Sequence, residues 1–195
     1  MMKKVACIGD SITWGFMLLN PRKWNYPTRL QELLGNGYEV RNFGYNDASV
    51  QFDADTPYVR KRVFRNSLEW NPDIVLLMLG TNDTKRRNWD SVRFRKDYLR
   101  LVDSYRTLPS APQVILIAPI RIFRIKGIAI MGVYPEILEE GVRPAIHEIG
   151  TETGLQVVDL EDLFSDNSFS LDGVHPLREG SRMIAERIFQ KVFAQ

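Results

Sequence analysis

The chain has 195 residues and a formal net charge of +2, from 26 lysine and arginine residues against 24 aspartate and glutamate residues. This length suits one domain, which we place at residues 1–195, and the near balance of charge argues against a nucleic-acid binder, which needs a concentrated basic face. The single cysteine, Cys7, excludes an intramolecular disulfide framework, and two histidines, His147 and His175, are too few for a histidine-rich metal centre.

The first residues argue against a membrane protein. The apolar run at residues 5–8 is too short for the core of a signal peptide and stops at Gly9 and Asp10. No stretch approaches the roughly 18 apolar residues of a membrane-spanning helix. As it stands, the sequence predicts a cytoplasmic protein that does not bind membranes. A trimmed leader peptide would leave no trace, so export stays an open alternative.

Five short apolar segments are typical of β-strands. In chain order they are residues 5–8, 38–43, 74–79, 114–118 and 155–160. The third and fourth segments are continuously apolar, as strands that are buried on both faces of a sheet should be. We therefore expect these two strands to lie inside the sheet.

Helical segments separate the predicted strands. Pro27 can open a short helix, residues 58–70 form a second, and Pro176 can begin the last. The third has one apolar face, formed at steps of 4, 3, 4 and 3 by Phe94, Tyr98, Leu101, Tyr105 and Leu108. This alternation predicts a three-layer α/β/α domain with about five parallel strands and helices on both faces.

In such a sheet the ligand crevice lies beyond the carboxyl ends of the strands. The residues that follow the strands are therefore the candidates for chemistry. They are residues 9–13, 44–47 and 80–83, together with residues 172–176 in the loop after the fifth strand.

Ser11, His175 and Asp172 are the parts of a Ser-His-Asp catalytic triad. A serine hydroxyl is a poor nucleophile until a nearby base removes its proton, and that base is usually a histidine. His175 is one of two imidazoles in the chain, and Asp172, three residues earlier, is close enough to accept a hydrogen bond from its ring. We expect Ser11 to attack, His175 to act as general base and Asp172 to orient it.

Acyl transfer also needs hydrogen-bond donors for the developing oxyanion, each worth roughly 3–4 kcal/mol. We assign this role to the backbone N–H groups of Ser11 and Gly44 and to the side-chain amide of Asn82. Asp10 is interpreted as structural, bonding loop amides. We expect His147 to be a solvated surface residue and Cys7 to serve only packing.

With these blocks in order, the sequence resembles the GDSL-type, or SGNH, serine hydrolases. Residues 9–13 are similar to the family's first block, while residues 80–83 and 172–176 are similar to its third and fifth. The family's name residues match Ser11, Gly44, Asn82 and His175. The resemblance implies a flavodoxin-like three-layer fold with an esterase site, and this chemistry needs no metal or cofactor.

A narrower resemblance concerns the substrate. Residues 79–83, Lys85, residues 88–89 and residues 171–176 are similar to bacterial carbohydrate O-acetylesterases of the sialate and xylan types. This implies a small-molecule or oligosaccharide ester as substrate. The basic and apolar alternation at residues 120–126 departs from that pattern.

Several alternatives stay open at this stage. A lysophospholipase or thioesterase would use an acyl groove lined by Ile120, Ile122, Phe123, Ile128 and Met131. A non-catalytic flavodoxin-like binding module would cradle phosphate in its first loop. Contact of substrate with Arg121, Arg124 or Lys126 is also open, although a charged loop is the simpler interpretation, as it is for residues 85–87. The sequence leaves the oligomeric state open.

Overall fold

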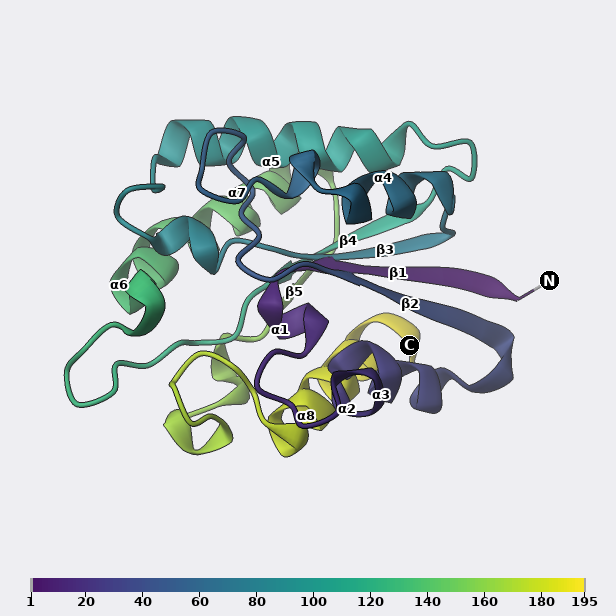
Figure 1. The fold of residues 1–195 in the computed structure, drawn as a ribbon. Helices are drawn as coiled ribbons and strands as arrows, with labels where there is room; N and C mark the ends of the chain where they lie inside the picture. The colour runs from purple at the N-terminus through teal and green to yellow at the C-terminus, as the bar shows by residue number, and fades with distance from the viewer. Residues whose placement is uncertain (1, 195) are drawn as a thin grey trace.

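The computed structural model describes residues 2–194, and its centre is a five-stranded parallel sheet (Figure 1). The strand order is β2-β1-β3-β4-β5. The strands are β1 (Lys3–Gly9), β2 (Tyr38–Gly44), β3 (Ile74–Met78), β4 (Gln113–Ala118) and β5 (Val157–Asp159). The predicted α/β fold with five parallel strands is confirmed, with β5 shorter than its apolar pattern suggested.

Helices cover both faces of the sheet (Figure 1). One face carries α4 (Arg62–Glu69), α5 (Ser91–Arg106) and α7 (Arg143–Thr153). The other face carries α1 (Ser11–Trp14), α2 (Pro21–Trp24), α3 (Tyr26–Leu34) and α8 (Arg178–Ile188). The short α6 (Pro135–Ile137) precedes α7. No helix within residues 2–194 is long and apolar enough to cross a membrane.

The two layers of the core follow from the alternation of side chains along the strands. In β1, Ala6 and Ile8 face the side that holds the buried apolar row of α5. Val5 and Cys7 face the opposite side, against Tyr26 of α3. Cys7 is fully buried, and this burial raises the pKa of its thiol well above the ordinary value. As expected, Cys7 is a packing residue.

Local signals account for the ends of the helices that frame the site. The Asp90 side chain accepts a hydrogen bond from the Arg93 N–H at 2.9 Å and so caps α5. α8 begins at Arg178, two residues beyond Pro176, because Pro176 pairs with Ser170 in an isolated bridge. This bridge closes the loop that contains Asp172 and His175.

The chain reverses direction across the sheet at β1. It passes from β1 to its neighbour β2 and then crosses to β3 on the other side of β1. Ligand crevices in open α/β sheets form at the carboxyl side of such a switch point. Ser11 lies directly after β1 at this place.

Candidate active site

Ser11 is held at the first turn of α1, immediately beyond β1. Asp10 caps this helix, because its Oδ1 accepts the Ile12 N–H at 2.9 Å. Gly9 has no room for a side chain, since an added Cβ would lie 1.9 Å from Thr13 Oγ1. The tight strand-to-helix connection therefore fixes the Ser11 hydroxyl at the carboxyl edge of the sheet. Asp10 has the structural role expected of it.

The structure brings Ser11, His175 and Asp172 into one hydrogen-bonded chain. Ser11 Oγ lies 2.8 Å from His175 Nε2, and His175 Nδ1 lies 2.7 Å from Asp172 Oδ2. An ionised Asp172 can only accept, so Nδ1 carries the ring proton and Nε2 is free to accept the proton of Ser11. The His175 ring is 3% exposed and contacts the Phe16 ring edge-on at 4.8 Å between centroids.

The second oxygen of Asp172 builds the loop around the histidine. Asp172 Oδ1 accepts hydrogen bonds from the N–H groups of Val174 and His175 and from the Ser170 hydroxyl, all at 2.8–2.9 Å. Burial on its own would raise the pKa of the Asp172 carboxyl, but the hydrogen bonds from the His175 ring and from the two N–H groups lower its pKa well below the ordinary value. Asp172 is therefore ionised at neutral pH.

Asn82 lies in the same cavity as Ser11 and His175. It is the first residue of a 3₁₀ turn, η3 (Asn82–Thr84), that follows β3. Its side-chain Nδ2 donates to the Ala48 carbonyl at 3.1 Å, and an amide nitrogen carries a second hydrogen that it can donate. The position is consistent with an oxyanion donor.

Gly44 does not have the role that the sequence suggested. Its N–H donates to Asn42 Oδ1 at 2.8 Å, and it lines a separate surface hollow beside Trp14 rather than the cavity at Ser11. A glycine is needed there because a Cβ would lie 2.4 Å from the Trp14 backbone nitrogen, where β2 meets α1. The expectation that the Gly44 N–H faces the oxyanion is wrong.

Two residues further along the same loop, Asn46 and Asp47, line the cavity. Asp47 has a φ of 62°, a left-handed conformation that aspartate and asparagine adopt more readily than most residues. Among residues 2–194, neither of these two N–H groups donates a hydrogen bond to another residue. The sequence placed both residues in the candidate segment 44–47 after the second strand, but we assigned the donor role in that segment to Gly44 alone.

Asp83 joins the two loops that flank the cavity. Its fully buried carboxylate accepts the N–H groups of Val50 at 2.9 Å and of Gln51 at 3.0 Å, so it fastens the loop after β2 to the turn after β3. Burial raises the pKa of Asp83 to about 6, although these hydrogen bonds lower it. Burial raises the pKa of Asp10 to about 6 as well, although the hydrogen bond from the Ile12 N–H and the electrostatic interaction with His175 lower it.

The raised pKa of Asp83 predicts a pH-dependent stability difference between wild type and Asp83→Asn. The folded pKa is above the unfolded value, so ionisation of Asp83 destabilises the wild type as the pH rises from about 4 to above 6. The free energy of unfolding of wild type relative to Asp83→Asn should therefore fall by up to about 3 kcal/mol over this range. Urea unfolding at pH 4, 5, 6 and 7 measures this difference. Parallel profiles, as expected for the exposed control Asp103→Asn, would contradict it.

Lys85 is not part of a solvated loop, contrary to the expectation for residues 85–87. It is 7% exposed, and its Nζ lies 3.2 Å from Asp47 Oδ1. Arg86 and Arg87 are exposed, as expected. The burial of Lys85 depends on a residue 38 positions earlier, which local composition does not reveal.

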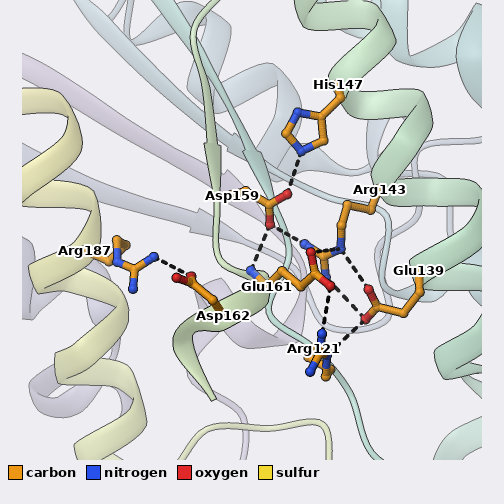
Figure 2. Close-up of polar contacts among 8 residues, drawn as sticks. All are labelled: Arg121, Glu139, Arg143, His147, Asp159, Glu161, Asp162 and Arg187. Atoms are coloured by element: carbon orange, nitrogen blue, oxygen red, sulfur yellow. Dashed lines mark hydrogen bonds and ion pairs between the residues drawn. The ribbon is translucent and has the colours of Figure 1, made fainter. Parts of the chain in front are cut away.

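The basic residues after β4 are engaged with carboxylates. Arg121 contacts Glu161 at 2.7 Å and Glu139 at 3.8 Å, and Figure 2 shows these groups gathered around the buried Arg143. Arg124 pairs with Glu136 at 2.7 Å. Lys126 lies in an exposed turn, and none of Arg121, Arg124 and Lys126 lines the cavity at Ser11.

His147 belongs to the same charged cluster rather than to the site. Its Nε2 lies 2.6 Å from Asp159 Oδ2, and about half of its side chain is exposed (Figure 2). It is thus a surface residue, as expected, with a carboxylate partner that the sequence did not show. Within residues 2–194, no three histidine, cysteine, aspartate or glutamate side chains are grouped so that they could hold a metal ion.

The cavity beside the Ser11 hydroxyl is small. Its volume is about 30 Å³, room for about two water molecules. Its polar lining comes from the loops just described, and its apolar lining comes from Phe16, Met131, Val133 and Val174. By contrast, the hollow beside Trp14 has a volume of about 600 Å³ but does not include any triad residue.

The sequence is similar to those of known ester hydrolases. An acetylxylan esterase from Xylanibacter ruminicola is 31% identical over an aligned length of 205 residues. The alignment covers 95% of this chain and 42% of that protein. The chain thus spans less than half the length of this relative. The sequence profile of the GDSL-like Lipase/Acylhydrolase family matches residues 7–183.

Solved structures share the whole fold. A carbohydrate acetylesterase from Sinorhizobium meliloti has a TM-score of 0.80 at 22% identity, covering 98% of this chain and 99% of that one. The aryl esterase of M. smegmatis also has a TM-score of 0.80, at 19% identity and the same coverage. At these identities the likeness shows the fold alone. Because the family profile extends from β1 into α8 and includes both Ser11 and His175, the chain belongs to the GDSL-like lipase/acylhydrolase family.

Proposed function

We propose that this domain is a serine esterase that removes short acyl groups, acetyl in particular, from carbohydrate hydroxyls. The observation that supports it most directly is the hydrogen-bonded chain from Ser11 Oγ through His175 to Asp172, with distances of 2.8 and 2.7 Å, at the edge of a small cavity. This arrangement is the one that activates a serine for acyl transfer.

The reaction follows from the positions of these atoms. Ser11 Oγ attacks the ester carbonyl while His175 Nε2 takes the hydroxyl proton, and the imidazolium is stabilised by Asp172. His175 then gives this proton to the departing alkoxide of the sugar, which leaves an acyl group on Ser11. A water molecule, deprotonated by His175, attacks the acyl-enzyme, and the proton returns to Ser11 Oγ as the carboxylic acid leaves.

The oxyanion of each tetrahedral intermediate needs donors that are already in place. We assign them to the Ser11 N–H, the Asn82 side-chain amide and the backbone N–H groups of Asn46 and Asp47. The last pair replaces Gly44, whose N–H is occupied by Asn42. Asn46 and Asp47 both line the cavity, and their N–H groups donate to no other residue between positions 2 and 194, which supports this assignment.

The size of the cavity supports a short acyl group. A volume of about 30 Å³ suits the few heavy atoms of an acetyl group better than a fatty acyl chain. The similarity to an acetylxylan esterase, and to a carbohydrate acetylesterase in fold, supports a glycan as the alcohol. The substrate we propose is therefore an acetylated small molecule or oligosaccharide.

The residues proposed for a long acyl groove are dispersed in the structure. Ile120 is fully buried in the core layer that holds α8, and Ile122 is buried in the layer on the other face of the sheet. Phe123 packs on Phe169, and Ile128 is 64% exposed. Met131 alone of this set lines the cavity at Ser11, so the lysophospholipase alternative has no groove formed by these residues.

The test is a comparison of acyl chain lengths and alcohols on the wild-type protein. We expect kcat/KM for p-nitrophenyl acetate to exceed that for p-nitrophenyl octanoate by about a hundredfold or more, since several methylenes have no room. Acetylated xylo-oligosaccharides should release acetate, measured by an enzyme-coupled assay. Activity that peaks at eight carbons would contradict the proposal and favour the lysophospholipase or thioesterase.

A further inference from the structure

The wall of the cavity includes two residues from a segment that the catalytic chemistry does not use. Residues 119–134 connect β4 to α6 and extend beyond the sheet (Figure 1). Met131 and Val133 of this segment line the cavity together with Ser11 and His175. Val133 is 3% exposed, whereas Met131 is 50% exposed, so Met131 lies between the cavity and solvent.

The segment has a defined shape. Ile125 and Ile128 exchange backbone hydrogen bonds of 3.0 Å across the turn at Lys126 and Gly127, which have φ values of 50° and 79°. Such a pair of left-handed residues is typical of a tight hairpin turn. Met131 is left-handed as well, with φ 55°, a conformation that is uncommon for a side chain of this type. Surrounding contacts must therefore hold Met131 in place.

Those contacts join the segment to both catalytic loops. The Phe123 N–H donates to the Gly173 carbonyl at 2.8 Å, in the loop between Asp172 and His175. The Tyr134 N–H donates to Thr84 Oγ1 at 3.1 Å, in the same turn as Asn82. Met131 is thus presented to the cavity by a segment that is anchored, on either side of it, to the residues that perform catalysis.

We propose that Met131 closes the acyl side of the cavity and limits this enzyme to acetyl-sized acyl groups. The inference rests on the proposed esterase function. A sugar ring is larger than a space of about 30 Å³, so in the proposed reaction the sugar lies outside the cavity and the acyl group lies inside it. The other apolar walls, Phe16, Val133 and Val174, are less exposed than Met131. Met131 is therefore the wall whose removal opens the cavity outward.

The experiment compares wild type with Met131→Gly. Glycine favours the φ of 55° that Met131 adopts, so this variant should fold, and it removes the whole side chain. The readout is kcat/KM for p-nitrophenyl acetate, butyrate and hexanoate. We expect the butyrate-to-acetate ratio to rise by about tenfold or more in Met131→Gly, because a single methylene in an apolar pocket changes discrimination by this order. Ile128→Ala, on the same hairpin but outside the cavity, should leave the ratio within about twofold.

Two outcomes would overturn the inference while the esterase itself stands. One is an unchanged butyrate-to-acetate ratio of kcat/KM in a Met131→Gly protein that is folded and active. Met131→Ala is the second variant for the same measurement. The other is a Met131→Gly variant in which kcat/KM changes between naphthyl acetate and nitrophenyl acetate, which differ in the alcohol, but does not change with the length of the acyl chain. A wild-type protein that does not hydrolyse p-nitrophenyl acetate would instead overturn the proposed function, and so the two failures are distinguishable.

Discussion

Ser11→Ala should lower kcat/KM for p-nitrophenyl acetate by about ten-thousandfold or more. Without Oγ no acyl-enzyme forms, and the residual rate comes only from donors that polarise the ester for attack by water. The loss should lie mostly in kcat, because the cavity walls and the donors that bind the ester remain. Pre-steady-state measurements with substrate in excess should also lose any initial burst of p-nitrophenol, which requires an acyl-enzyme.

The matched control is Ser104→Ala, which removes a partly exposed hydroxyl that, among residues 2–194, bonds only the Arg100 carbonyl in α5. It should retain wild-type activity. Thermal unfolding should show that Ser11→Ala is folded, since Ser11 makes only one side-chain hydrogen bond, to His175. A Ser11→Ala protein that keeps a tenth of the activity would show that this serine is not the nucleophile.

Strong local patterns explain how much of the site could be predicted. The continuous apolar runs around Val75 and Leu116 identify buried strands, and parallel strands bring their carboxyl ends to one edge. Ser11 directly follows such a strand, so its place at this edge follows from topology. Asp172 and His175 are only three residues apart, and a contact over that distance depends on one short loop.

The errors arise where tertiary contacts decide the outcome. Gly44 lies at a strand end, but a glycine is needed there because β2 approaches α1 closely, not because its N–H binds an oxyanion. The left-handed backbone of Asp47 depends on a loop that Asp83 fastens from the next strand end. Met131 lines the cavity only because its segment is bonded to Gly173 and Thr84, more than 40 residues away in either direction. None of these contacts has a local sequence signal.

Asp172→Asn should lower kcat by about a thousandfold to ten-thousandfold while KM changes little. The reason is that the two carboxylate oxygens of Asp172 have different hydrogen-bond partners. Oδ1 accepts three hydrogen bonds that build the loop, including those from the Val174 and Ser170 groups, so the amide oxygen of asparagine must take this place. The amide nitrogen then faces His175 Nδ1, where the wild type has an acceptor at 2.7 Å.

An amide nitrogen can only donate, so Nδ1 must become the acceptor and the ring proton must move to Nε2. Nε2 then donates toward Ser11 and cannot take its proton, although every atom of the triad is in place. The exposed Asp166→Asn, which caps a neighbouring turn through the Ser168 N–H, is the matched control and should keep its activity. Because the pKa of Asp172 lies well below its ordinary value, the wild type should keep this carboxylate ionised in mild acid. A kcat ratio of wild type to variant near one at pH 7 would show that His175 is oriented without Asp172.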